Sequence, residues 1–382
     1  MDYKNVKTFP GLNTIRFAAA FLVVMHHGET IRKKNGVENL EWFGLFNNGG
    51  NAVTIFFVLS GFLITYLLLK EKFKTNNISI RTFYMKRILR IWPLYFLLVF
   101  IGTIALPVVF NLLGVDYEMP YTLGQTWHYY VFFLPGLVTF FWGHHFLEPL
   151  WSIGVEECFY LLWAPLFKFV KKNILALLLS VIAIKVLLRI IGYVFIGNDL
   201  FNYIINIFLF EAMAIGGLGA YYLYTNGNSL IRLFIFRIPF QIMLFTLLAV
   251  YLFLHTNIHN PVWDLIFRNQ FISPLLIDFL FLYPIICVSV IPNSIVRLNN
   301  KFLSYLGEIS YGIYMYHMLV IFTVIFFLKK YMLNMSLITG TILFYLITTV
   351  LTIIIAALSK SLFENYFLKI KDRLTKKSLQ AA

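Results

Sequence analysis

Residues 15–27 read Ile-Arg-Phe-Ala-Ala-Ala-Phe-Leu-Val-Val-Met-His-His, an apolar run with Arg16 near its start and His27 at its end. Ionisable residues are rare inside membrane helices and usually serve a function there. The eleven-residue separation of Arg16 and His27 corresponds to about 16 Å of helical rise and almost the same helix face. The pair predicts a membrane helix that binds an anion at one end and does proton chemistry at the other. The alternative is that both side chains only mark the two membrane interfaces.

The composition indicates a polytopic membrane protein. Hydrophobic residues make up 60% and charged residues 13% of the 382 residues. We expect an all-α integral membrane bundle of about ten transmembrane helices, because most of the apolar runs are long enough to cross about 30 Å of hydrocarbon. The ten runs lie near residues 12–27, 49–69, 92–113, 150–167, 173–196, 201–224, 239–255, 271–291, 303–328 and 336–358.

The basic residues indicate the orientation of the bundle. The net charge is +14, but lysines and arginines cluster in alternate loops, as the positive-inside rule expects, so nucleic acid is not an expected partner. Both termini are predicted to be cytoplasmic, and the first run is predicted to be a retained helix. The membrane domain is expected over residues 1–363, followed by a basic cytoplasmic tail over residues 364–382 that lies near anionic lipid.

The segment 127–142 is the weakest point of this topology. It is short and interrupted by Pro135 and Gly136, so we expect it to lie in the membrane interface or to dip into the protein. A full crossing would invert the orientation of every later helix.

Two motifs bring further charges to the predicted membrane boundary. Arg87 and Arg90 are three residues apart, with Lys86 alongside, and would share one face of a helix. Such a cluster suits the phosphates of a nucleotide-like donor, or the headgroups of lipids. In the run Trp151-Ser-Ile-Gly-Val-Glu-Glu-Cys-Phe-Tyr160, Glu156 and Glu157 lie about two turns inside the fourth predicted span.

Glu156 is predicted to pair with His27, because both approach the outer half of the bundle and a carboxylate that orients an imidazole is a recurrent general-base arrangement. The competing interpretation is a buried ion pair of Glu156 or Glu157 with Arg189.

The remaining candidates lie in two other spans. Ser60 precedes Gly61 in the second span, where the small pair permits close helix packing beside the site. Tyr314 and His317 share a face of the ninth span, where they bind an acceptor hydroxyl or only join helices. We assign Ser60, Glu157, Tyr314 and His317 to substrate binding and expect no metal, because the loop histidines lack ligand spacing.

Together these motifs resemble acyltransferase family 3, a family of integral membrane proteins. The resemblance rests on Arg16-x10-His27, the Ser-Gly of the second span, Phe83-Tyr84-x2-Arg87-x2-Arg90-Ile-x-Pro93, Trp151–Tyr160 and Ser310-Tyr-Gly-Ile-Tyr-x-x-His317. It implies transfer of an acyl group, acetyl in the usual case, from acetyl-CoA or another acyl-CoA to a hydroxyl of a cell-surface or lipid-linked carbohydrate.

The resemblance also implies roles for single residues. His27 matches the family's catalytic histidine and Glu156 its motif acid, while Arg16 matches the paired motif arginine and Arg87 and Arg90 match the donor-handling motif. We assign Arg16, Arg87, Arg90 and Lys86 to donor binding. His27 either deprotonates the acceptor or carries the acyl group itself, and the sequence leaves both routes open. We expect a bacterial cytoplasmic membrane location and no metal cofactor.

Two other functions remain open from the sequence. A transporter or flippase for a glycolipid or polysaccharide precursor would use the same charges to line a pathway. A structural subunit of an envelope-synthesis complex would use them only to hold helices together.

Overall fold

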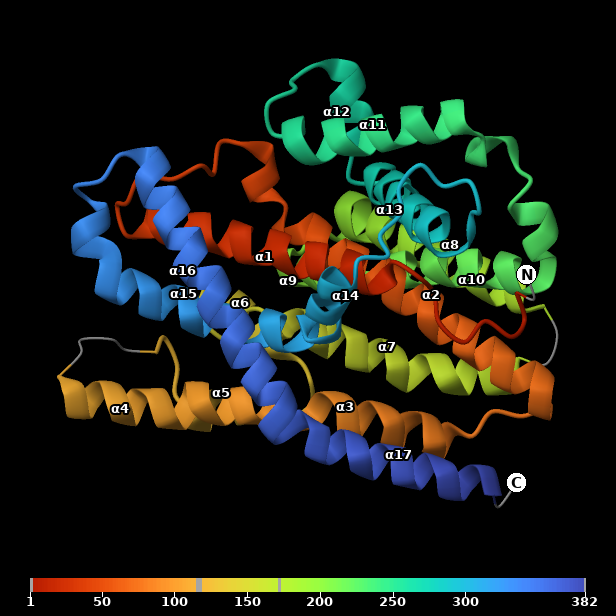
Figure 1. Ribbon diagram of the computed structural model, residues 1–382, viewed down its shortest axis with the longest axis horizontal. Helices are drawn as coiled ribbons and strands as arrows, with labels where there is room; N and C mark the ends of the chain where they lie inside the picture. The colour runs from red at the N-terminus through yellow and green to blue at the C-terminus, as the bar shows by residue number, and fades with distance from the viewer. Residues whose placement is uncertain (1–2, 115–118, 171–172, 381–382) are drawn as a thin grey trace.

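The computed structural model describes residues 3–114, 119–170 and 173–380, and all regular structure in these ranges is helical. The long helices run roughly along one direction and pack side by side (Figure 1). They are α1 (Leu12–Lys34), α2 (Gly49–Thr75), α3 (Ile80–Phe100), α7 (Leu150–Phe169), α8 (Ile174–Ile190), α10 (Phe210–Leu230), α11 (Ile238–Leu254), α13 (Ser273–Val290), α15 (Ser310–Met332), α16 (Leu337–Ser359) and α17 (Asn365–Gln380).

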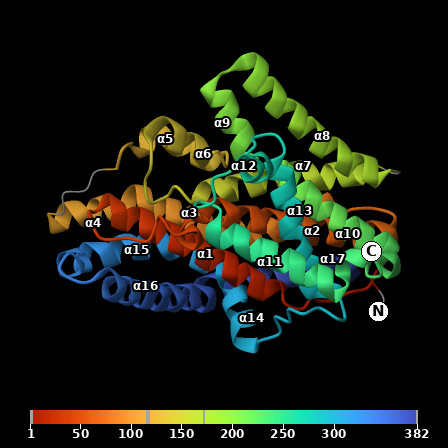
Figure 2. The ribbon, with the colours of Figure 1, turned by 90° about the horizontal axis from the view of Figure 1, so that it is seen from above.

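Shorter helices connect or extend the long ones. The α-helical ones are α4 (Leu106–Leu113), α5 (Leu123–Val131), α6 (Pro135–Trp142), α9 (Asp199–Ile207), α12 (Pro261–Phe267) and α14 (Lys301–Glu308). Short 3₁₀ or π turns add η1 (Gly44–Asn47), η2 (Ile101–Ala105), η3 (Ile191–Ile196), η4 (Phe234–Phe236) and η5 (Lys360–Glu364). In Figure 2, α8 and α9 lie on one side of the bundle and α15 and α16 on the opposite side.

Within the described residues, seven helical stretches are long and apolar enough to cross a membrane. They are Gly49–Thr75, Ile80–Leu112, Ile174–Ile196, Asp199–Leu230, Ser273–Val290, Ser310–Met332 and Leu337–Leu374. The other predicted spans are α1 and α7, whose apolar runs carry ionisable side chains, and α11, which has 17 residues. The all-helical fold with apolar helices of membrane-spanning length is therefore confirmed, and the count of ten spans stays a prediction.

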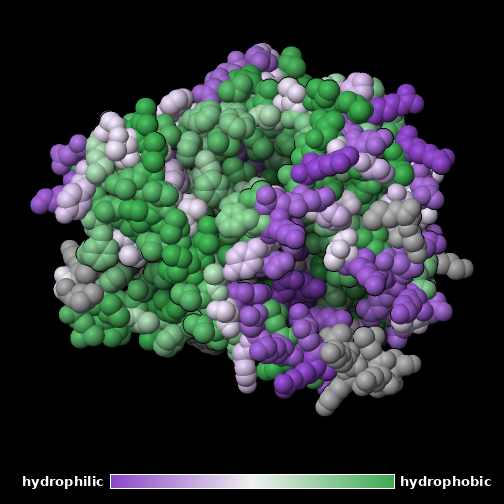
Figure 3. Space-filling model, viewed as in Figure 1, coloured by the Kyte–Doolittle hydropathy of each residue, from purple (hydrophilic) through white to green (hydrophobic). Residues whose placement is uncertain are grey.

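The surface agrees with a membrane-embedded bundle. Hydrophilic side chains gather over the end where both termini lie, and a broad hydrophobic area covers α15 and α16 (Figures 1 and 3). Both described ends of the chain thus lie at the same end of the bundle. The side of the membrane they face stays a prediction.

Glycines allow close contact between α2 and α10. A Cβ atom on Gly61 would overlap the carbonyl oxygen of Met213, and one on Gly216 would overlap that of Val58. Small residues let membrane helices approach backbone to backbone. The expected packing role of Gly61 is confirmed.

Two helices begin or end differently from the sequence prediction. α3 begins at Ile80 instead of near residue 92, because the Ser79 side chain caps its first turn by accepting a 3.3 Å hydrogen bond from Thr82 N. α1 continues to Lys34, past the predicted boundary at residue 27. A buried ion pair between Glu29 and Arg32 satisfies the charges of this last part.

The segment 127–142 forms no single helix. α5 and α6 are separated by a turn in which Phe133 has φ +57°, and the Phe133 ring stacks on Tyr95 with 4.6 Å between centroids. Each helix is under about 15 Å long, too short to cross the hydrocarbon core alone.

The predicted tail continues the helix of α16. η5 joins α16 to α17, and the described part of α17 lies beside α3. The predicted boundary between residues 363 and 364 therefore falls inside a helical stretch that packs on the bundle. The division into a membrane domain and a tail stays a prediction.

Candidate active site

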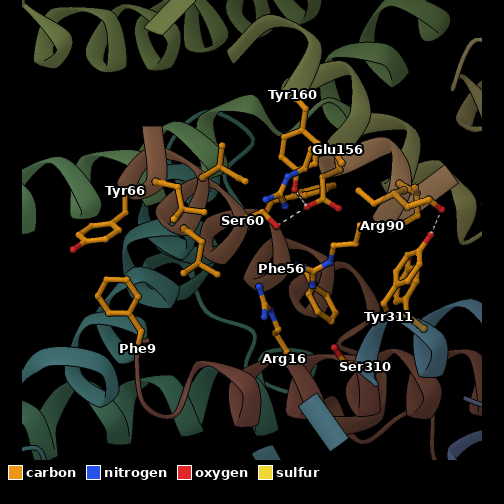
Figure 4. Close-up of a pocket in the computed structure, with 18 of the residues that line it drawn as sticks. Phe9, Arg16, Phe56, Ser60, Tyr66, Arg90, Glu156, Tyr160, Ser310 and Tyr311 are labelled. Atoms are coloured by element: carbon orange, nitrogen blue, oxygen red, sulfur yellow. Dashed lines mark hydrogen bonds between the residues drawn. The ribbon is translucent and has the colours of Figure 1, made fainter. Parts of the chain in front are cut away.

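A cavity of about 300 Å³ opens among α1, α2, α3, α7 and α15. Its polar wall combines guanidinium, carboxylate and hydroxyl groups, and its apolar wall comes largely from α2 (Figure 4). The polar lining side chains are Lys7, Thr8, Arg16, Ser60, Tyr66, Arg87, Arg90, Ser152, Glu156, Tyr160, Glu308, Ser310, Tyr311 and Tyr314. The cavity therefore contains residues from each of the motifs that the sequence singled out.

Arg16 enters this cavity from the second turn of α1. Its NH1 donates a 3.2 Å hydrogen bond to Asn13 Oδ1, and its guanidinium extends toward Ser60 and Glu156 (Figure 4). Arg16 and Glu156 interact electrostatically. One side of the guanidinium is thus bound to Asn13, and the other side faces the cavity and is available to a ligand.

Glu156 is bound by hydroxyl groups on both sides. Its Oε1 accepts a 2.6 Å hydrogen bond from Ser60 Oγ and a second one from Tyr160 OH. No hydrogen bond joins Glu156 to His27 in the part of the chain that the structure describes. The predicted pairing of His27 with Glu156 is therefore wrong, because Glu156 lies at the Arg16 end of α1.

Arg87 and Arg90 both line the cavity from one face of α3, as their spacing predicts. The Arg87 guanidinium carbon lies 5.6 Å from the Tyr160 ring centre and 5.9 Å from that of Phe83. Arg87 Nε is buried without a hydrogen-bond partner among the described residues, and Arg90 is exposed. Lys86 is not part of the cavity wall, because it lies on another face of α3.

Glu157 points away from the cavity. Its Oε2 accepts a 2.9 Å hydrogen bond from Trp92 Nε1, and its Oε1 is buried without a partner among the described residues. One residue along a helix turns the side chain by about 100°, which separates Glu157 from Glu156. Arg189 pairs with Glu211 at 2.5 Å, so the ion pair of Arg189 with Glu156 or Glu157 is also excluded.

His27 lies at the other end of α1, in a cluster of three histidines. Its ring centre is 5.2 Å from that of His317 and 5.3 Å from that of His26. His317 Nδ1 is 2.5 Å from the carbonyl oxygen of Tyr314. A carbonyl oxygen only accepts, so Nδ1 carries the proton, and a neutral His317 keeps its lone pair on Nε2.

Tyr314 links the cavity to the histidine cluster. Its hydroxyl lies 2.7 Å from Ser152 Oγ and donates a 3.0 Å hydrogen bond to the Pro149 carbonyl oxygen. Its ring centre is 5.6 Å from that of His317. Tyr314 and Ser152 line the cavity, whereas His317 and His27 do not. Tyr314 therefore separates the cavity from the histidine cluster.

The end of α1 beyond His27 is fixed by a second set of bonds. Glu29 Oε1 lies 2.7 Å from Arg32 NH1 and 2.6 Å from Tyr345 OH, and Glu29 Oε2 accepts from Leu40 N. Tyr345 OH also lies 2.9 Å from the Met25 carbonyl oxygen. This network ties the histidine-bearing turn of α1 to α16.

Sequence reasoning gave no role to Tyr160, Ser152 or the Glu29 network. Tyr160 follows Glu156 by four residues, so helical spacing alone could have placed its hydroxyl near that carboxylate. The contacts of Ser152 with Tyr314 and of Glu29 with Tyr345 join helices that are distant in the sequence, and no local pattern predicts them.

The described residues contain no group of three His, Cys, Asp or Glu side chains that could hold a metal ion. No solved structure matches the chain.

The relatives of the chain have names that refer to O-acetyl transfer. A provisionally named O-acetyltransferase of Staphylococcus aureus (strain COL) is 26% identical over 403 residues, which cover 96% of this chain and 58% of the relative. The peptidoglycan O-acetyltransferase of Listeria monocytogenes is 29% identical over 188 residues, covering 47% of this chain and 28% of the relative. The chain thus spans less than two thirds of the length of these relatives.

A sequence model of the family described as "Acyltransferase domain" matches residues 9–360, nearly the whole chain and all the motifs of the cavity. The chain belongs to acyltransferase family 3.

Proposed function

We propose that this protein transfers an acetyl group from acetyl-CoA to a hydroxyl of a cell-envelope carbohydrate. The observation that carries the proposal is the cavity, in which Arg16, Arg87 and Arg90 converge and whose wall at Tyr314 adjoins the His27 cluster. The Listeria relative is named as a peptidoglycan O-acetyltransferase, and peptidoglycan is therefore the acceptor we propose first.

The donor end of the cavity suits coenzyme A. Arginines bind phosphates through charge-assisted, often bidentate hydrogen bonds. Arg90 is exposed at the mouth, and Arg87 lies deeper with an unpartnered Nε among the described residues. Apolar side chains of α2, such as Phe56 and Ile64, line the cavity farther in and would cover the acyl-bearing arm.

His27 would act where the thioester meets the acceptor. In the direct route, an imidazole nitrogen takes the proton from the acceptor hydroxyl, whose oxygen attacks the thioester carbonyl. The C–S bond then breaks, and the coenzyme A thiolate receives the proton from the imidazolium. In the two-step route, the imidazole takes the acetyl group first and the acceptor then removes it.

The groups that orient His27 differ from the sequence prediction. Glu156 would fix Ser60 and Tyr160 and balance the arginines of the donor end. His317 packs on His27 and is itself held by the Tyr314 carbonyl. His317 is therefore the positioning residue that we propose for His27.

A membrane location with the donor end in the cytoplasm fits this reaction. Both termini lie at one end of the bundle, and the predicted topology puts that end on the cytoplasmic side of a bacterial cytoplasmic membrane, where acetyl-CoA is available. A carbohydrate or glycolipid acceptor would approach from the opposite face. A transporter would move such a substrate without consuming coenzyme A, and membership of an acyltransferase family weighs against that alternative.

Thermal unfolding with acetyl-CoA tests the donor site without any acceptor. A ligand that binds only the folded state stabilises it, by about 2.7 kcal/mol at 100 times its dissociation constant. We expect a rise in the unfolding temperature of the wild type that the Arg87→Ala, Arg90→Ala variant loses.

Lys86→Ala is the matched control for this experiment, because Lys86 lies on the same helix but outside the cavity. It should keep the full acetyl-CoA effect. No stabilisation of the wild type by acetyl-CoA, together with no coenzyme A release on adding soluble peptidoglycan fragments, would contradict the proposed function.

A further inference from the structure

A second hollow lies beyond the histidine end of α1, between the α1–α2 connection and the α11–α12 connection. Its volume is about 640 Å³. We call it the Trp42 groove and define it by its lining residues Lys33, Asn39, Glu41, Trp42, Asn47, Thr256 and Asn257. We propose that the Trp42 groove binds a neutral pyranose ring of the acceptor carbohydrate. The proposal rests on the proposed function and names a recognition site for its acceptor.

Trp42 supplies an aromatic platform. Its side chain is 64% exposed, whereas its backbone carbonyl accepts a 3.4 Å hydrogen bond from Asn257 Nδ2. The indole is thus presented outward from a backbone that is tied to the opposite wall of the groove. A pyranose has one face made mainly of C–H groups, and such a face packs well on a flat, rigid indole.

The rim of the groove suits the hydroxyl groups of a sugar. Asn39, Asn47, Thr256 and Asn257 provide amide and hydroxyl groups that both donate and accept hydrogen bonds. Asn47 has no hydrogen bond from its side chain to any other described residue. A sugar ring carries the same mixture of donors and acceptors around its edge.

The charge of the groove favours a neutral ligand. Its two charged residues, Lys33 and Glu41, pair with each other, so the lining has no net charge. An anionic lipid headgroup or a nucleotide would be expected to select an excess of lysine or arginine, as at the mouth of the donor cavity. The two hollows therefore differ in charge. The donor cavity suits an anionic donor, and the Trp42 groove suits a neutral acceptor.

The groove is connected to the histidine cluster through a rigid floor. Asn48 follows the lining residue Asn47, and its Nδ2 donates 2.7 Å hydrogen bonds to the carbonyl oxygens of Gly44 and Leu252. The next residue, Gly49, leaves no room for a Cβ atom against the His26 ring. Lys33 lies on α1 six residues beyond His27, which is about 9 Å of helical rise.

A groove held in shape in this way loses little entropy on binding a ligand. The helical rise from His27 to the lining residue Lys33 is about the length of two sugar rings, so a sugar bound in the groove would direct a neighbouring residue of the same glycan toward the histidines. Figure 1 shows the α1–α2 connection lying beside α11.

Calorimetric titration with a soluble oligosaccharide tests the groove in the absence of acetyl-CoA. The probe is chitotetraose, a neutral chain of N-acetylglucosamine, and the protein is held in amphipol because maltoside and glucoside detergents would compete. We expect Trp42→Ala to weaken binding at least about tenfold, which is about 1.4 kcal/mol. Trp127→Ala is the matched control, because Trp127 on α5 is 51% exposed but outside the groove, and it should bind as the wild type does.

Two outcomes would overturn the proposal. One is equal binding by the wild type and Trp42→Ala, or no binding by the wild type at millimolar chitotetraose. The other is quenching of the Trp42 fluorescence, taken as the wild type minus Trp42→Phe, in nanodiscs of brominated lipid, since this would make Trp42 a membrane-interface anchor.

Acetyl-CoA stabilisation of Trp42→Ala is measured alongside. It should equal that of the wild type, because Trp42 is not part of the donor cavity. A failure of the groove proposal would leave this stabilisation intact, whereas a failure of the proposed function would remove it from both proteins.

Discussion

The two ends of α1 carry different chemistry in different surroundings. Arg16 lies in a cavity with further arginines, hydroxyl groups and the carboxylate of Glu156. His27 lies among aromatic rings, with His26 and His317 as neighbours and no carboxylate bound to it in the described residues. A single helix therefore holds apart a region suited to anion binding and a region suited to proton transfer.

In the proposed reaction, this separation lets one membrane bundle serve both the donor and the acceptor. The proposed role of the arginines is to bind the anionic donor. An imidazole acts as a base only when it is neutral, and nearby buried cations favour the neutral form whereas nearby buried carboxylates oppose it. At the His27 end, the carboxylate of Glu29 is bound to Arg32 and Tyr345 and forms no hydrogen bond to His27 among the described residues. The comparison predicts that changes at the Arg16 end alter donor affinity and changes at the His27 end alter the rate of transfer.

The largest effect is expected at His27. His27→Gln removes the titratable nitrogen while keeping a polar side chain of similar size, so transfer should fall about 100- to 10,000-fold. Acetyl-CoA should still raise the unfolding temperature of this variant, because the donor cavity is unchanged. Initial rates of coenzyme A release with acceptor, beside thermal unfolding, measure both.

His26→Gln serves as the control at the neighbouring position. It should lose far less activity, because His26 packs against Gly49 at the start of α2. Transfer by His27→Gln at the wild-type rate would show that the histidine end is structural, and the contrast between the two ends of α1 would disappear.

A smaller effect of a different kind is expected at Glu156. Ser60 and Tyr160 both donate to Glu156 Oε1, so Glu156→Gln keeps an oxygen acceptor for both but removes the negative charge that faces Arg16 and Arg87. An anionic donor should then bind several-fold more tightly, while transfer slows about tenfold because both hydroxyls then bond to a neutral acceptor instead of a charged one. The KM for acetyl-CoA and kcat should therefore both fall.

Glu157→Gln tests whether this effect belongs to the cavity. Glu157 bonds to Trp92 outside the cavity wall, so its neutral variant should leave the KM for acetyl-CoA unchanged. Weaker acetyl-CoA binding by Glu156→Gln would mean that the carboxylate holds the arginines in place for the donor, contrary to the charge balance argued above.

Local patterns in the sequence predicted the features that depend on a single helix. The shared face of Arg87 and Arg90 follows from their spacing of three residues, and the structure places both on the cavity wall. The close packing at Gly61 follows from its small size in an apolar run. Both predictions need only helix geometry and residue volume.

Contacts between helices were harder to predict. Counting residues from the start of each predicted span places Glu156 and His27 in the outer half of the bundle. The depth of each helix depends on its packing, however, and that packing places Glu156 beside Ser60. Arg189 finds Glu211 on α10, and Glu157 finds Trp92 on α3. A buried charge can be recognised in one sequence, but its partner is set by the assembled bundle.

The smallest effect is expected at the residue between the two regions. Tyr314→Phe removes the hydroxyl that bonds to Ser152 and to the Pro149 carbonyl, and should slow transfer only a few-fold, since one neutral hydrogen bond contributes about 1 kcal/mol.

Tyr314→Ala removes the ring as well, which opens the donor cavity toward the His27 cluster. Water should then reach the thioester, so acetyl-CoA hydrolysis without acceptor should rise above that of the wild type. Tyr311→Phe, which lines the same cavity and loses a 2.8 Å hydrogen bond to the Ile91 carbonyl, should not raise it. Equal hydrolysis by Tyr314→Ala and the wild type would mean that the two ends of α1 are not separated by this ring.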